Sequence, residues 1–423
     1  MRSPIHVYMI YGMIVMYASC YQMQAPLEPF LVGQLIGDDK GSDAATEYGK
    51  LQSFFNVVQT LGSLTFGYLL DRTGVRVGFA INFLCCAATY AILSQTTTIG
   101  MLYLSKVPSV GMAGFLVAQV GMSKLTEEGV ERVSALGRLT TAYTIGGVMG
   151  PYIGGVLGSS GDYYLSAKLA TVGCLLAAFA AFLLPAAVDE TVGDKPSDKE
   201  DTKPKVQTPF IDRAKLLITV AGGALLVKFI TNVANSMAQS TQVLIMKNDL
   251  QFGEADLGTF LSASFAFGGV ANGFLLGPLT SVLGGKVGKV VQNSACIMML
   301  CYGLRGALFH PAYTLLPEDL LIRRGVFIGL ALFLSLFQFA MGTSITVATT
   351  KLVPQDMVGT LIGSEHGIFA VARVFSPFVG TSLLTSGGIP AVSAACAACF
   401  AAAVGVWQIG VGDRGSKEED KKA

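Results

Sequence analysis

The sequence predicts an all-α membrane protein with twelve transmembrane helices in two pseudo-symmetric six-helix bundles. Three observations predict this fold: the composition, the number of long apolar stretches and an internal repeat. Charged residues are 13% of the 423 residues and apolar residues are 52%, whereas soluble domains carry about 25% charged residues. The net charge of +1, with no basic face, argues against a nucleic-acid-binding protein.

Each half of the chain contains six apolar stretches that are long enough to cross a bilayer, which takes about 20 helical residues. In the first half, the expected spans cover residues 6–29, 48–70, 77–95, 99–122, 136–158 and 165–187. In the second half, they cover residues 216–246, 255–283, 290–309, 325–350, 359–384 and 390–411.

These stretches divide the chain into two domains and two polar segments. We expect an N-terminal bundle over 1–188, a charged cytosolic linker over 189–215, a C-terminal bundle over 216–411 and a disordered cytosolic tail over 412–423. The linker is rich in charge, Pro and Thr and has too few apolar residues to pack.

The two halves repeat each other at two places. GYLLDRTGVR at 67–76 and GPLTSVLGGK at 277–286 carry two glycines and a basic residue at matching offsets, with Ser281 in the place of Asp71. A second match aligns Gly137, Gly150, Pro151 and Gly154 with Gly363, Ser376, Pro377 and Gly380. Two matches from equivalent spans predict a duplicated six-helix bundle.

The distribution of positive charge predicts the orientation. An even number of spans places both termini and the linker on one side of the membrane, and that side carries nineteen Lys and Arg residues against six on the other. By the positive-inside rule, we expect the termini and the linker in the cytosol. The sequence leaves open which membrane holds the protein.

The fifth predicted span contains an array of glycines, GRLTTAYTIGGVMGPYIGG, at 137–155. Gly146, Gly150 and Gly154 lie on one helix face and let another backbone approach closely, and Gly155 ends the array. Pro151 removes a backbone hydrogen bond and is expected to bend the helix. The alternative is an ordinary packing face, because small residues at this spacing are common in membrane helices.

Four basic residues lie within predicted spans: Lys106, Lys228, Arg305 and Arg373. Each costs about 2.5 to 3.5 kcal/mol on insertion scales, so a position facing lipid is disfavoured unless the side chain reaches the interface. Arg305 lies near a span end, and we expect it to snorkel.

Three of these residues, Arg373, Lys228 and Lys106, are candidates for a substrate or coupling pathway, and other polar residues share the helices of Arg373 and Lys228. Arg373 falls near the middle of the membrane by the repeat, and His366 lies seven residues earlier on nearly the same face. Lys228 lies midway along its span, and Asn232 and Asn235 extend the polar face. A water-filled path fits this pattern better than lipid does.

Two carboxylates and three carboxamides complete the candidate pathway. Glu28 and Glu365 lie within or at the edge of spans, and either can carry a coupling proton if burial favours its neutral form. A solvated carboxylate at the rim is the alternative for each. Gln52, Asn56 and Gln59 share a helix face and can bond a substrate or a neighbouring helix.

The loop after the second span carries the pattern GxxxDRxGxR, at Gly67, Asp71, Arg72, Gly74 and Arg76. With this loop pattern, the sequence resembles the major facilitator superfamily. The resemblance extends over essentially the whole chain. The resemblance implies that the aspartate helps to hold the outward-facing state near helix ends of the opposite bundle, and a carboxylate is favoured at a helix N-terminus. It also implies that the two bundles rock about a central site.

The glycine array resembles a motif of antiporters in this superfamily, especially drug:proton antiporters. That resemblance implies a tight, leak-resistant interface between the bundles. Lys106 resembles the arginine of the superfamily's span-four motif, although the rest of that motif is missing. Short stretches such as SALGRL, LLVKFITN and GTLIG resemble the organic-cation-transporter-like solute carriers.

We therefore expect a secondary active transporter that moves a small organic solute, an organic cation or drug by resemblance, in exchange for protons. The basic residues create a conflict, because unpaired cations in the cavity favour an organic anion. An organic-anion transporter or facilitator, and a non-transporting receptor or scaffold, are the alternatives. We expect a monomer in the lipid bilayer, with no catalytic residues, no cofactor and no metal, since Cys396 and Cys399 lack a histidine or acidic partner.

Overall fold

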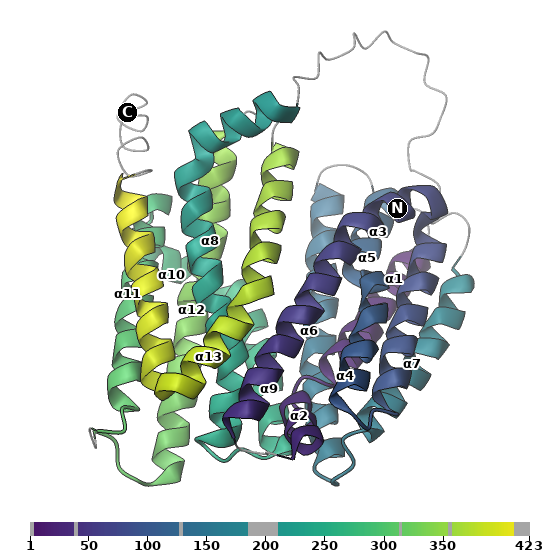
Figure 1. The fold of residues 1–423 in the computed structure, drawn as a ribbon. Coiled ribbons are helices and arrows are strands. Elements are labelled where there is room, and N and C mark those ends of the chain that lie inside the picture. The colour runs from purple at the N-terminus through teal and green to yellow at the C-terminus, as the bar shows by residue number, and fades with distance from the viewer. Residues whose placement is uncertain are drawn as a thin grey trace. The chain divides into compact units, whose positions relative to one another are not determined.

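The computed structural model describes residues 4–37, 41–126, 130–184, 210–312, 315–353 and 358–409. In these ranges the chain folds into helices joined by turns and short loops (Figure 1). Most of the expected linker, residues 189–209, and the expected tail, 412–423, lie outside the described residues.

The helices cluster into two compact units. The first contains residues 1–202 together with 251–269, and the second contains residues 203–250 and 270–423. The division into bundles at the linker therefore stays a prediction, because the contacts place residues 251–269, the first part of α9, with the first half of the chain.

The first half of the chain contributes seven α-helices and one 3-10 helix among the described residues. They are α1 (Pro4–Gln22), α2 (Glu28–Ile36), α3 (Ser42–Leu93), α4 (Ile99–Lys106), η1 (Val107–Gly111), α5 (Gly114–Leu125), α6 (Val130–Gly158) and α7 (Leu165–Phe182). Pro108 at the start of η1 accounts for the break between α4 and α5, because it lacks a backbone N–H.

The second half contains the long α8 and five further α-helices among the described residues. They are α8 (Phe210–Asn248), α9 (Glu254–Val270), α10 (Leu276–Val282), α11 (Val287–Leu308), α12 (Leu320–Leu352) and α13 (Val358–Trp407). A π-helical turn, η3 (Ala271–Leu275), joins α9 to α10.

The described residues of the twelve predicted spans lie mostly on these helices. Residues 185–187 and 410–411, at the ends of two spans, lie outside the described residues. α3 covers the second and third spans and α13 covers the last two, and each turns at a glycine with a positive φ, 81° at Gly74 and 64° at Gly388. Gly284, which aligns with Gly74 in the repeat, also has a positive φ, 109°. Residues other than Gly rarely adopt this conformation, so both copies of the loop need a glycine at this position.

The second repeat is also visible in the packing. A Cβ atom at Gly154 of α6 would collide with the backbone of Met23, which directly follows α1. A Cβ atom at Gly380 of α13 would lie 3.1 Å from the carbonyl oxygen of Met237 in α8. In each half, the glycine helix therefore packs closely against the first helix of its own half.

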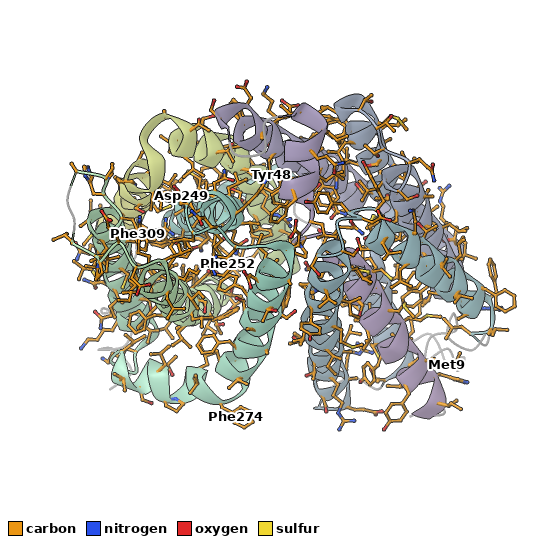
Figure 2. All side chains as sticks on the ribbon, turned by 90° about the horizontal axis from the view of Figure 1, so that it is seen from below. Met9, Tyr48, Asp249, Phe252, Phe274 and Phe309 are labelled. Atoms are coloured by element: carbon orange, nitrogen blue, oxygen red, sulfur yellow. The ribbon has the colours of Figure 1, made fainter. Side chains whose placement is uncertain are left out.

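The surface and the core have the distribution expected of a protein in lipid. Phe274, Phe179 and Leu176 are more than 60% exposed, and six stretches of the described residues are long and apolar enough to span a bilayer. Aromatic residues fill the interiors, with Phe79 stacked on Phe83 in the first unit and Tyr302 stacked on Phe400 in the second. Figure 2 shows side chains extending from the helices in all directions. The chain is therefore an all-α membrane protein, as predicted.

Candidate functional site

The first unit contains a buried ion pair between α2 and α4. Lys106 Nζ lies 2.5 Å from Glu28 Oε1, and the two side chains are only 9% and 11% exposed. Gln52 of α3 donates from Nε2 to the second carboxylate oxygen of Glu28 at 2.8 Å, and the ammonium group lies 5.4 Å from the ring centroid of Phe55. Three residues that are distant in the sequence thus form one charge-neutral cluster.

The second unit contains a similar pair between α8 and α13. Lys228 Nζ lies 2.6 Å from Glu365 Oε2, and the side chains are 17% and 7% exposed. Two hydroxyl groups of α12 complete the cluster: Thr346 accepts a hydrogen bond from Lys228 at 2.9 Å, and Thr349 donates to Glu365 Oε1 at 2.7 Å. Both oxygens of the carboxylate therefore have a partner.

These pairs resolve two questions that the sequence left open. Glu28 and Glu365 are not solvated carboxylates at a rim, because each is buried and paired with a lysine. Lys106 and Lys228 are likewise compensated, so they add little net positive charge to a pathway. An isolated buried charge costs several kcal/mol, and an opposite charge at contact distance offsets that cost.

The glycine array contacts two different helices. Cβ atoms at Gly146 and Gly150 would lie 2.5 Å from backbone oxygens of α1, those of Val15 and Ser19. A Cβ atom at Gly155 would lie 2.5 Å from the carbonyl oxygen of Glu254 in α9. The helix face with Gly146 and Gly150 thus contacts a helix of its own half, which differs from the expected interface between bundles. Gly155, in contrast, contacts a helix from the other half of the chain.

Comparison with known families identifies the family of the chain. The family model described as Major Facilitator Superfamily matches residues 10–377. This chain belongs to the major facilitator superfamily. It is therefore an integral, multi-pass membrane transporter of solutes and not an enzyme.

Relatives of this superfamily member align along nearly its whole length. Solute carrier family 22 member 18 of Mus musculus is 25% identical over 402 residues, which cover 91% of this chain and 90% of that protein. Tetracycline resistance protein, class C, of Escherichia coli is 22% identical over 392 residues, which cover 90% of each chain. The crystal structure of the human organic anion transporter MFSD10 (TETRAN) has a TM-score of 0.64 at 15% identity and covers 96% of this chain and 100% of that chain.

The residues of the superfamily loop pattern lie around the turn within α3. Gly74 makes the turn, and a Cβ atom at Gly67 would meet open space. Arg76 donates from Nη2 to the carbonyl oxygen of Phe182 at the end of α7, at 2.8 Å, whereas the guanidinium of Arg72 lies 4.2 Å from the ring centroid of Tyr68. The side chain of Asp71 lies outside the described part of the structure.

Four other predicted pathway residues are carboxamides of α3 and α8. In the first unit, Asn56 is buried, and Gln59 Nε2 is buried with no hydrogen-bond partner among the described residues. In α8, Asn232 Nδ2 and Asn235 Oδ1 are also buried without partners in the described ranges. Such groups cost free energy unless water or a ligand bonds them, so they are compatible with a hydrated path.

Arg373 and His366 lie on α13, the helix that also carries Glu365, and they differ in exposure. The guanidinium of Arg373 is half-buried and lies 5.4 Å from the ring centroid of Phe369. His366 is exposed, although it directly follows the buried Glu365. The interpretation of Arg373 and His366 as one polar face therefore stays a prediction.

The expectation that Arg305 snorkels is wrong. Arg305 of α11 is 5% exposed, and its Nε donates to Ser393 Oγ in α13 at 2.9 Å. Its guanidinium lies 4.8 Å from the ring centroid of Tyr302 and 6.0 Å from that of Phe327. Cation–π contacts at this distance stabilise a desolvated cation, so Arg305 links three helices of the second unit.

We predict that Arg305→Ala lowers the melting temperature of the detergent-solubilised protein, because it removes a buried hydrogen bond and two ring contacts that together contribute about 2 kcal/mol or more. Arg72→Ala is the matched control and should change the melting temperature much less, because Arg72 is exposed. Differential scanning fluorimetry measures both variants. Equal, small shifts would contradict a structural role for Arg305.

Sequence reasoning missed the hydroxyl groups of α12. Thr346 and Thr349 lie three residues apart on one face of a predicted span, and a pair of threonines at helical spacing is too common to single out. It also missed Tyr163, whose hydroxyl donates to Glu254 Oε1 at 2.8 Å at the start of α9. Contacts across about ninety residues leave no local signal in one sequence.

Proposed function

We propose that this superfamily member is a secondary active transporter that moves a small organic solute by alternating access in exchange for protons. The observation that carries the proposal is the buried lysine–glutamate pair in each unit. The orientation with both termini in the cytosol and the monomeric state belong to the same proposal.

Each carboxylate can hold one of three positive partners: a proton, the lysine ammonium group or a cationic solute. Protonation of Glu365 removes its charge and leaves Lys228 without a counter-ion, with a hydrogen bond to Thr346. A buried charge that loses its partner is unstable by several kcal/mol, so protonation favours a rearrangement of the helices that carry the pair. This rearrangement is how proton binding and solute movement become linked.

Pairing of the lysines favours an organic cation or a drug-like compound as the solute. With Lys106 and Lys228 compensated, the cluster residues carry no net charge, so the repulsion expected for a cation from unpaired lysines is largely removed. The similarity to a tetracycline resistance protein supports a drug-like compound. An organic anion is the second candidate, because Arg373 lies within a predicted span and an arginine keeps its positive charge.

We expect the purified protein in liposomes to show solute flux that rises when a pH gradient is imposed in the direction of exchange. Flux of tetracycline, a fluorescent organic cation and a fluorescent organic anion should be compared, because their relative rates assign the charge of the solute. Empty liposomes are the control. Flux that ignores the gradient would exclude proton coupling and leave facilitated transport.

A further inference from the structure

A cavity opens at the end of the first unit where α2 ends and α3 and α4 begin. Its volume is about 430 Å³, and it is lined by Ile36, Asp43, Thr46, Glu47, Lys50 and Ile99. In Figure 1, α2 lies at the lower end of this unit, opposite the end marked N. Figure 2 looks from below and labels Tyr48, a neighbour in sequence of Glu47. The charge count of the loops assigns this end to the non-cytosolic side.

Glu47 connects the cavity to the interior of the unit. Its Oε2 accepts a hydrogen bond from the exposed Lys50 at 3.0 Å, and its Oε1 accepts one from the hydroxyl of Tyr103 at 2.8 Å. Tyr103 belongs to α4 and packs edge-on against Phe54, with ring centroids 5.2 Å apart. The aromatic contact holds the ring in place, and the hydroxyl points to the carboxylate in the cavity wall.

The cavity, Tyr103 and the buried ion pair follow one another along α4. Ile99, Tyr103 and Lys106 lie four and three residues apart, so they share one helix face. Ile99 lines the cavity, and Lys106 pairs with Glu28. Tyr103 thus lies about one helical turn from the pair, which is about 5 to 6 Å between Cβ atoms.

We propose that Glu47 and Tyr103 form the route by which protons pass between this cavity and the Glu28–Lys106 pair. The inference rests on the proposed function, since it names the path that coupling protons take in the first unit. In each transfer toward the interior, Tyr103 Oη accepts a proton from Glu47, its hydrogen-bond partner, and its own hydroxyl proton crosses about one helical turn to Glu28 through a bridging water, so the tyrosine is unchanged. The proton that arrives neutralises Glu28, and the freed ammonium group of Lys106 can turn toward Tyr103, because the lysine stem has four flexible carbons.

The charged and titratable groups around this route are few in the described part of the first unit. Asp43 and Lys50 of α3 face Glu47 in the cavity. Tyr48 of α3 lies within electrostatic range of Glu28, which also contacts Lys106 of α4. Among these groups, Glu47 both lines the cavity and accepts a hydrogen bond from Tyr103.

The protonation of Glu28 after a pH jump tests the route without knowledge of the solute. The full-length protein is placed in liposomes, and infrared spectroscopy follows the carboxylic-acid band that is lost in Glu28→Gln. Tyr103→Phe keeps the ring contact and removes the hydroxyl, and Glu47→Gln keeps an acceptor for Tyr103. In both variants we expect Glu28 to be protonated about 100-fold more slowly, a typical contribution of a positioned proton-transfer group.

Tyr152→Phe is the matched control, since Tyr152 is an exposed tyrosine of α6, and it should leave the rate unchanged. Rates in Tyr103→Phe and Glu47→Gln equal to that of the wild type would overturn the route, and so would a wild-type Glu28 whose band does not respond to the jump. Flux driven by a pH gradient tests the proposed function separately. Coupled flux with unaltered Glu28 kinetics in Tyr103→Phe would overturn the route alone.

Discussion

Glu365→Met should abolish the stimulation of solute flux by a pH gradient and lower the stability of the protein. The substitution removes the protonatable group and the counter-ion of the largely buried Lys228, which keeps its hydrogen bond to Thr346. Loss of one partner of a buried pair costs about 3 to 5 kcal/mol. Lys228→Met should destabilise the protein by a similar amount, because it leaves the Glu365 carboxylate unpaired.

The double variant Lys228→Met/Glu365→Met separates structure from function. Removal of both charges often restores stability, because two apolar side chains of similar size no longer need compensation. We expect the double variant to melt near the wild-type temperature while its flux stays insensitive to the pH gradient. Coupled flux in the double variant would show that the pair is structural.

A surface ion pair provides the control. Lys168 and Asp162 lie 3.3 Å apart with side chains 52% and 42% exposed, and such pairs contribute about 0 to 1 kcal/mol. Lys168→Met should therefore leave both the melting temperature and the coupled flux near those of the wild type.

Gly154→Ala and Gly137→Ala should change stability in opposite directions, although both replace a glycine within α6. A Cβ atom at Gly154 would collide with the backbone of Met23, and a backbone cannot move aside as a flexible side chain can. Overpacking of this kind costs about 1 to 3 kcal/mol and occasionally more. A Cβ atom at Gly137 meets open space, so alanine there should stabilise the helix by up to about 1 kcal/mol.

Thermal unfolding of the two variants in the same detergent measures this difference. We expect Gly154→Ala to melt below the wild type and Gly137→Ala to melt at or above it. Similar shifts for both would mean that the approach of α6 to α1 is looser than the structure indicates.

The sequence predicts the helices better than it predicts their partners. The twelve spans follow from the length of the apolar stretches, and the shared turn at Gly74 and Gly284 follows from the repeat. The glycine spacing also predicts a close helix contact. The spacing does not say which helix makes that contact, because small residues permit close approach of any backbone, and Gly150 contacts α1.

The ion pairs of the candidate site also show that the sequence does not predict which residues contact each other. Lys106, Lys228, Glu28 and Glu365 stand out in the sequence because charges in a membrane are costly. Their pairing depends on contacts across 78 and 137 positions of the chain, and one sequence contains no measure of such distances. The prediction for Arg305 was wrong for a related reason. Its position near a span end does not reveal that Ser393 and aromatic rings surround its side chain.

Proton exchange by this transporter is tested most simply by a count of the protons that are released when a solute binds. A solute that raises the melting temperature is added to the solubilised protein, and calorimetry in buffers of different ionisation enthalpy gives the number of protons released. We expect the wild type to release protons and the variant Glu28→Gln/Glu365→Gln to release none. Binding without proton release in the wild type, or equal release by that variant, would mean that these carboxylates do not exchange protons with the solute.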